Sequence, residues 1–162
     1  HFISDTLTPI MRVITQFGGT ILMIVWAIAS LVLITNKRIA VSVVSNLVLI
    51  ALLNNILKLI VRRNRPTGFR LIEETGYSFP SGHSMVSMAF YGYLIYMIYK
   101  NVKNKKLRWT LITCFSLLIL IIGMSRIYLG VHYTSDVFAG FLFSIGYLVV
   151  YIKLTDPIVF QK

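Results

Sequence analysis

Acidic residues, cysteine and charged residues in general are all scarce in this 162-residue chain. Charged residues make up 13% of the chain and hydrophobic residues 57%, whereas soluble domains are about 25% charged and about 45–50% apolar. The apolar residues occur in long runs, which excludes a soluble domain with a large core and indicates an integral membrane protein. The single cysteine, Cys114, permits no intrachain disulfide, and its place within an apolar run indicates an unreactive packing residue.

The shortage of acidic residues leaves a formal net charge of +11, from 16 Lys and Arg against five Asp and Glu. In a soluble chain this charge would point to a nucleic-acid partner. Here the basic residues gather in short segments between apolar runs, which fits membrane topology and an anionic ligand better. We therefore expect membrane lipids as the surroundings and no nucleic-acid partner.

The apolar runs also lack the alternation of apolar and polar side chains that is typical of β-strands, and they are too long for strands. They predict helices over residues 17–35, 39–57, 84–99, 109–124 and 133–152. A bilayer core needs roughly 17–25 helical residues; the third and fourth stretches reach this length only with their flanks. The expected fold is all-α, a polytopic transmembrane helical bundle that forms one domain over residues 1–162. Residues 1–16 are expected to be an interfacial, partly helical lead-in.

Successive connections between spans lie on alternating sides of the membrane, and this divides the basic residues into two groups. The larger group has nine members: Lys37, Arg38, Lys100, Lys103, Lys105, Lys106, Arg108, Lys153 and Lys162. The smaller group has six: Arg12, Arg62, Arg63, Arg65, Arg70 and Arg126. The positive-inside rule places the larger group in the cytoplasm. Because the chain starts with His1 rather than Met, we expect a further helix before it and six spans in the native protein.

Three polar segments interrupt the apolar pattern: KLIVRRNRP (58–66), PSGH (80–83) and SRIYLGVHYTSD (125–136). By the same alternation, all three lie on the outer side of the membrane. Ionisable groups are costly near the bilayer core, so their presence there predicts a functional site.

The first two segments offer groups that suit an anion. Lys58 and Arg65 are seven residues apart and share one helical face if the helix continues that far; a basic helix end that anchors the chain among lipid headgroups is an equally good interpretation. Ser81 is a natural N-cap and Gly82 permits close backbone approach, so the amides that follow can bind an anion. Taken alone, an ordinary helix start with His83 beside it is the simpler interpretation.

The third segment combines a histidine with a carboxylate. His132 and Asp136 are spaced as neighbours on one helical face, so the carboxylate can hold one ring N–H and leave the other nitrogen free as nucleophile or base. Arg126 can fold back towards them across a turn at Gly130. A structural His–Asp pair between helices is the alternative for this segment alone. Together, the cations, the two histidines and the helix N-terminus on one membrane face favour a site for a phosphoryl group.

The order and spacing of these residues resemble the three signature motifs of the type 2 phosphatidic acid phosphatase superfamily. The matching residues are Lys58-x6-Arg65-Pro66, Pro80-Ser81-Gly82-His83 and Ser125-Arg126-x5-His132-x3-Asp136. The resemblance implies a bundle of typically six helices and a lipid phosphatase that needs neither a metal nor another cofactor. It implies that His132 attacks phosphorus to form a phosphohistidine, that Asp136 orients His132, and that His83 protonates the leaving group and then activates water. The phosphoryl oxygens would be held by Lys58, Arg65, Ser81, Gly82 and Arg126.

Compact bacterial members of this family hydrolyse undecaprenyl diphosphate, phosphatidylglycerophosphate or both. We therefore expect a multi-pass protein of a bacterial plasma membrane, with an outward-facing site and undecaprenyl diphosphate as its main substrate; phosphatidylglycerophosphate is the alternative. Arg62, Arg63 and Arg70 are extra charges that can meet a second phosphate or an anionic headgroup. Glu73 and Glu74 are better explained as solvated loop residues than as catalytic ones.

Two other classes of function stay open on the sequence alone. His83, His132 and Asp136 have the composition of a two-histidine, one-carboxylate metal site, although Arg65 and Arg126 would be unfavourable beside a metal. A non-enzymatic protein that binds or transports lipid phosphates would explain the charges within the membrane, but it gives no reason for the His–Asp spacing.

Overall fold

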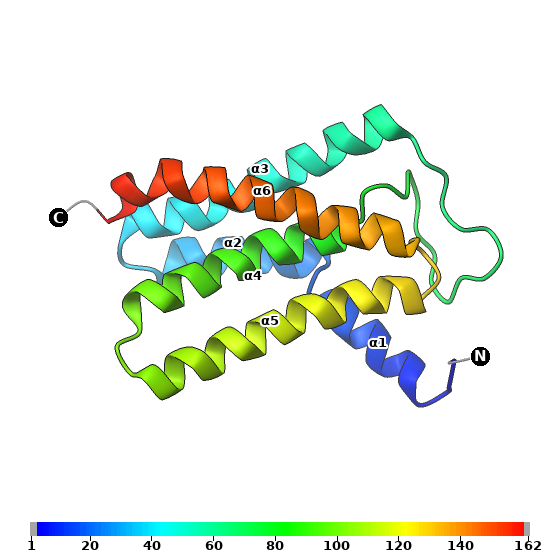
Figure 1. Cartoon of the computed structure of the whole chain (residues 1–162), viewed down its shortest axis with the longest axis horizontal. Helices are drawn as coiled ribbons and strands as arrows, with labels where there is room; N and C mark the ends of the chain where they lie inside the picture. The colour runs from blue at the N-terminus through cyan, green and yellow to red at the C-terminus, as the bar shows by residue number, and fades with distance from the viewer. Residues whose placement is uncertain (1–2, 161–162) are drawn as a thin grey trace.

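The computed structural model describes residues 3–160, and the regular elements within this range are all helices. They are α1 (Leu7–Gln16), α2 (Thr20–Leu33), α3 (Lys37–Val61), α4 (Gly82–Asn101), α5 (Lys105–Tyr128) and α6 (Thr134–Val159). Helices α2 to α6 run side by side along the long axis of the molecule, while α1 is tilted away at one end (Figure 1). The predicted all-α bundle is confirmed.

Three of the helices are long and apolar enough to cross a membrane. These are α3, α5 and α6, whose most apolar 18-residue windows have mean hydropathies of 2.1, 2.1 and 2.0. Helices α1 and α2, bent by 41° at the short break between them, can together form a fourth span. Helix α4 is less apolar because it carries serine, glycine and tyrosine, but it packs against α3, α5 and α6 and is shielded by them.

The core lies around α4, and the outside of the bundle is apolar. Phe90, Tyr91 and Tyr93 of α4 are buried with Val43 of α3 and Ile122 of α5. Large apolar side chains such as those of α2 and α6 are instead exposed, as expected of helices that face lipid. Cys114 of α5 belongs to this exposed surface, so the prediction that it is a packing residue is wrong. An apolar run in a membrane helix faces lipid as well as protein, and hydropathy alone does not separate the two.

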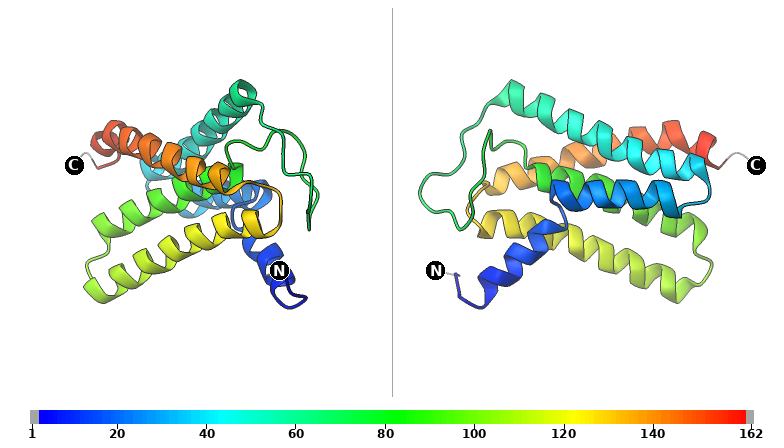
Figure 2. Two further views of the ribbon diagram at one scale, coloured as in Figure 1. Left: turned by 45° about the vertical axis from the view of Figure 1, so that its right-hand side comes forward. Right: turned by 180° about the vertical axis from the view of Figure 1, so that it is seen from behind.

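The three polar segments meet at one end of the bundle. The last turn of α3, the long 62–81 loop, the end of α5 and the start of α6 all lie at this end, and the α2–α3 and α4–α5 turns lie at the other (Figures 1 and 2). Helix α3 ends at Val61, where Arg62 adopts a left-handed conformation with φ 50°. The helix therefore does not continue to Arg65. Lys58 and Arg65 would share a helical face only if it did, so they do not. Pro66 disfavours helical geometry in the residue before it, and Arg65 reaches the site from a loop.

The connection between α5 and α6 determines where His132 lies. Gly130 has φ 72°, and a Cβ at this position would lie 2.1 Å from the carbonyl oxygen of Phe69, so the turn packs tightly against the 62–81 loop. Helix α6 begins only at Thr134. His132 therefore lies in the turn before the helix. The sequence spacing predicts instead that His132 and Asp136 share a helical face, and this prediction is wrong.

Candidate active site

Residues from all three polar segments line one cavity of about 610 Å³. Lys58, Arg65, Gly82, His83 and His132 all contribute to its wall. The two histidines are 49 positions apart in the sequence and both line this cavity, as the sequence predicts. The remaining three candidates lie behind this wall: Ser81, Arg126 and Asp136 are 0%, 1% and 0% exposed.

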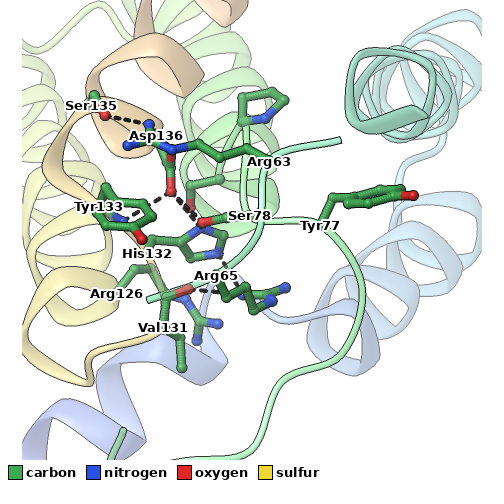
Figure 3. A network of polar contacts seen from close by, with 12 residues as sticks. Arg63, Arg65, Tyr77, Ser78, Arg126, Val131, His132, Tyr133, Ser135 and Asp136 are labelled. Carbon is green, nitrogen blue, oxygen red and sulfur yellow. Dashed lines mark hydrogen bonds and ion pairs between the residues drawn. The ribbon is translucent and has the colours of Figure 1, made fainter. Parts of the chain in front are cut away.

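The imidazole of His132 lies between a carboxylate and a guanidinium (Figure 3). Its Nδ1 is 3.5 Å from Oδ2 of Asp136, and its Nε2 is 3.2 Å from Nη1 of Arg65. With a proton held on Nδ1 by the carboxylate, the Nε2 lone pair faces the cation and accepts a hydrogen bond from it. This is the arrangement that a nitrogen nucleophile needs when it attacks an anionic group bound by the arginine.

The Asp136 carboxylate is itself fixed by several donors (Figure 3). Oδ2 accepts hydrogen bonds from the Ser78 hydroxyl and from the backbone N–H of Tyr133, the latter at 2.9 Å. Oδ1 pairs with Nη1 of Arg63 at 2.9 Å. Arg63 also donates to Oγ of Ser135 at 2.7 Å and lies 4.0 Å above the Tyr133 ring. The carboxylate is thus held in one orientation towards His132 by contacts with three parts of the chain.

Arg65 is buried by backbone carbonyls of two loops. Its Nη2 and Nε donate to the carbonyl oxygens of Thr75 and Gly76 at 2.9 and 3.1 Å, and its Nη1 donates to that of Val131 at 3.0 Å. These contacts close the 62–81 loop onto the turn that carries His132. Arg65 therefore both fixes the loop and presents a positive charge to the histidine.

Arg126 and Lys58 complete the positive side of the site. Arg126 lies in the last turn of α5, where its Nη1 donates to Oγ1 of Thr15 at 2.7 Å and its Nη2 pairs with the Glu74 carboxylate. The ammonium of Lys58 donates to the carbonyl oxygen of Tyr77. Of these three cations, Lys58 and Arg65 line the cavity and Arg126 lies behind its wall. Their combined positive charge favours a ligand with several negative oxygens.

Helix α4 starts at the site in the manner that its PSGH sequence predicts. Ser81 is the N-cap, and its hydroxyl accepts a hydrogen bond from the backbone N–H of Ser84 at 3.4 Å. The backbone N–H of Ser81 donates to the carbonyl oxygen of Asp136 at 3.1 Å, which joins α4 to α6. A Cβ on Gly82 would lie 3.1 Å from Oδ1 of Asn54, so the close approach expected at this glycine is to a side chain of α3.

Two residues of this network were not recognised in the sequence. Ser78 lies two positions before the PSGH segment and carries no pattern of its own, and Arg63 was interpreted as a cation for a second phosphate rather than as a partner of Asp136. In the described part of the chain, no three His, Cys, Asp or Glu side chains gather closely enough to hold a metal ion. The arrangement of His83, His132 and Asp136 therefore gives the metal-site alternative no geometric support.

The surroundings of His132 also determine its charge. Burial lowers the pKa of His132 from 6.5 to about 4; the hydrogen bond to Asp136 opposes this shift, and the positive charges of Arg65 and Arg126 add to it. The free imidazole is therefore neutral at pH 7, the form in which its nitrogen is a nucleophile.

We predict that His132 takes up its proton only when the pH falls to about 4. This can be measured in the detergent-solubilised protein labelled with ¹⁵N-histidine, by following the ring nitrogens with pH. The His132→Gln variant assigns the signals, because the resonances that it removes belong to His132. A midpoint near the ordinary 6.5 would contradict the burial that the structure shows.

The comparisons with known proteins agree with this geometry. The family model described as the PAP2 superfamily matches residues 38–158. Phosphatidylglycerophosphatase B of Bacillus subtilis is 38% identical over 105 residues, which are 62% of this chain and 49% of that protein, so the chain aligns with about half of that relative. Undecaprenyl-diphosphatase of Sulfolobus acidocaldarius is 29% identical over 161 residues, 94% of this chain and 74% of that protein.

A solved structure is similar over almost the whole chain. The crystal structure of a transmembrane PAP2 type phosphatidylglycerolphosphate phosphatase from Bacillus subtilis superposes with a TM-score of 0.86 at 25% identity, covering 99% of this chain and 82% of that one. The family-model match spans most of the chain and contains all eight candidate site residues. Because the family model matches well over half of the chain, the chain belongs to the PAP2 superfamily.

Proposed function

We propose that this protein is a membrane-embedded phosphatase that removes phosphate from a lipid phosphate or diphosphate through a phosphohistidine at His132. The observation that carries the proposal is the position of His132, with Asp136 on Nδ1 and Arg65 on Nε2, at the wall of a cavity that His83 also lines. A protein that only binds or transports phosphate needs the cations but has no use for an oriented imidazole pair. The names of the two relatives, both phosphatases, support the same reaction class.

The proposed reaction has two steps. Nε2 of His132 attacks phosphorus, the bond from phosphorus to the leaving oxygen breaks, and His83 gives that oxygen a proton. In the second step, His83 takes a proton from water, the water oxygen attacks phosphorus, and the bond to His132 breaks to release phosphate. Asp136 holds the Nδ1 proton and stabilises the positive charge that develops on the ring. Lys58, Arg65 and Arg126 neutralise the phosphoryl oxygens, together with the first amides of α4.

The shape of the cavity supports a lipid as the substrate. Its polar end carries the histidines, and the rest of its wall is apolar and comes from two neighbouring helices. The apolar lining consists of Met23, Ile24 and Ala27 of α2 and Val44, Leu47, Val48 and Ala51 of α3. Such a cavity can hold a phosphate at one end and the beginning of an apolar chain along α2 and α3.

We propose undecaprenyl diphosphate as the main substrate and phosphatidylglycerophosphate as the second candidate. A diphosphate needs positive charge beyond the reacting phosphate. Arg63 is engaged with Asp136. Arg62 and Arg70 are exposed on the same loop, and their Nε atoms donate to the backbone carbonyl oxygens of Leu59 in α3 and of Pro66. These two arginines are the groups that we assign to the second phosphate. The proposed location is a bacterial plasma membrane with the site on the outer face, because the site end carries the smaller group of basic residues.

The experiment that tests the function compares turnover of the two lipids by the purified protein, with phosphate release as the readout. We expect release from both, a higher kcat/KM for undecaprenyl diphosphate, no loss of activity in excess chelator, and inhibition by orthovanadate as a mimic of the five-coordinate transition state. No release from either lipid would indicate a binding or transport protein, and loss of activity in chelator would restore the metal-site alternative. A higher kcat/KM for phosphatidylglycerophosphate would reverse the order of the two substrates.

The same assay tests the orientation. Right-side-out membrane vesicles should hydrolyse a short-chain lipid phosphate added outside without being permeabilised. A requirement for permeabilisation would place the site on the cytoplasmic face.

A further inference from the structure

Two adjacent glutamates in the 62–81 loop have different surroundings. Glu73 is exposed and takes part in none of the ion pairs between residues 3 and 160. The side chain of Glu74 is 27% exposed, and its two oxygens contact two arginines. Oε1 pairs with Nη2 of Arg126, and Oε2 lies 3.8 Å from Nη2 of Arg65. The interpretation of both glutamates as solvated loop residues is therefore wrong for Glu74.

The two arginines that Glu74 contacts are those to which we assign the phosphoryl oxygens. They are 1% and 8% exposed, and a buried guanidinium without an anion is unstable. The carboxylate supplies this anion when the cavity holds no phosphate. It does not use all the available donors, because Nε of Arg126 is buried without a hydrogen-bond partner in the described part of the chain. A phosphoryl group has more oxygens than a carboxylate and can satisfy more of these donors.

Glu74 also borders the cavity itself, beside Arg65, His83 and His132. Its carboxylate and a bound phosphoryl group would therefore compete for the same guanidinium groups, and two anions so close together repel each other. We propose that Glu74 is an internal competing anion, which occupies the Arg65–Arg126 pair in the empty site and withdraws when a phosphoryl group binds. This inference rests on the proposed function, since it concerns the same phosphate site.

The withdrawal of Glu74 requires only a movement of its side chain. The backbone beside it is held in place, because the carbonyl oxygens of Thr75 and Gly76 accept hydrogen bonds from Arg65 and that of Tyr77 accepts one from Lys58. The side chain is partly open to the exterior, so it can turn outwards while the loop stays closed. The charge of both arginines then becomes available to the ligand.

Such competition weakens the binding of the substrate and of the product alike. Any phosphoryl ligand must displace Glu74, and its apparent affinity falls by the same factor. A lipid substrate offsets this loss through its apolar chain in the α2–α3 part of the cavity, whereas free phosphate has no such contact. Glu74 therefore leaves the preference between the two ligands unchanged, but it weakens the binding of inorganic phosphate and promotes release of the product.

The test measures the binding of inorganic phosphate and orthovanadate to the purified protein, by titration calorimetry and by the shift in Tm. The Glu74→Gln variant removes the charge and keeps the size, and we expect it to lower the Kd of both anions about tenfold, the effect of losing one charge-assisted hydrogen bond that competes with the ligand. Glu74→Asp, which keeps the charge but shortens the side chain, should give a smaller decrease. Glu73→Gln is the matched control, with the same change of charge one residue away, and should leave both Kd values within about twofold of the wild type.

The outcomes separate the two proposals. An unchanged Kd in Glu74→Gln would overturn the proposal that Glu74 competes with the ligand. A higher Kd would show instead that Glu74 positions the arginines for phosphate. An equal effect of Glu73→Gln would show that the Kd responds to the total charge of the loop and not to the position of Glu74, which would also overturn the proposal. If Glu74→Gln does not fold, the same comparison rests on Glu74→Asp. Anion binding does not require turnover, so a wild-type protein that binds phosphate but hydrolyses no lipid would contradict the proposed function and leave this inference standing.

Discussion

Replacement of His132 by alanine is expected to lower kcat for phosphate release from a lipid phosphate by at least about a thousandfold, because the attacking nitrogen is lost. The measurement is a phosphate-release assay under saturating substrate, with the folded state checked by Tm. Binding of inorganic phosphate should persist, because Arg65 and Arg126 are held by Val131 and Thr15 and not by the imidazole alone. Loss of turnover together with retained phosphate binding would separate the chemical role of His132 from a structural one.

Trapping of the intermediate sharpens this expectation. The protein reacts briefly with a ³²P-labelled substrate and is then quenched with alkali. An acid quench is unsuitable because phosphohistidine is hydrolysed in acid. We expect label on the wild-type protein and none on His132→Ala. The control is His83→Ala assayed with p-nitrophenyl phosphate, whose leaving group needs no proton, and this variant should still become labelled. Label that persists in His132→Ala would assign the nucleophile to another residue.

Replacement of Asp136 by asparagine is expected to reduce kcat by about 10³–10⁴-fold, the size of the effect when an orienting carboxylate of this type is changed to an amide. An amide N–H facing Nδ1 would favour the tautomer with its proton on Nε2, which removes the lone pair from the side of Arg65. It would also remove the charge that pairs with Arg63, although Arg63 is 38% exposed and can be solvated again. KM should change much less than kcat, because Asp136 lies behind His132 and away from the ligand.

Asp156→Asn is the matched control for this variant. Asp156 lies in the same helix and also forms an ion pair, with Lys100 at 2.5 Å, at the other end of the bundle. Its replacement should leave kcat within about twofold of the wild type, as is usual for an exposed ion pair. Wild-type turnover in Asp136→Asn, or an equal loss in both variants, would rule out the orienting role.

The positions of the helices were predictable from hydropathy, but their ends were not. Helix α6 continues from the predicted end at residue 152 to Val159. Hydropathy falls at Lys153, but the helix persists because Asp156 binds Lys100 and Tyr96 of α4. Helix α3 stops before Arg65 for the opposite reason, since consecutive charged residues and the following proline outweigh the seven-residue spacing. The end of α6 depends on contacts with α4 that a hydropathy pattern does not contain, and the end of α3 depends on local charge and on proline rather than on hydropathy.

The candidate site shows the same division. The residues around the cavity were recognisable because they combine residue type with spacing within a short segment. The contacts of Ser78 and Arg63 with Asp136, and of Glu74 with Arg126, join residues that are 58, 73 and 52 positions apart. Each depends on how the 62–81 loop folds over the turn at Gly130, and neither charge nor composition indicates which of several loop side chains will reach the site.

The hydroxyl of Thr15 joins α1 to the candidate site. This residue is buried and holds Nη1 of Arg126, yet it lies before residue 38, where the match to the family model begins. Tyr91 of α4 likewise donates to the carbonyl oxygen of Phe17, just after α1. A fragment trimmed to residues 38–158 would keep every motif but leave Arg126 without this anchor, so the intact candidate site includes the tilted helix α1.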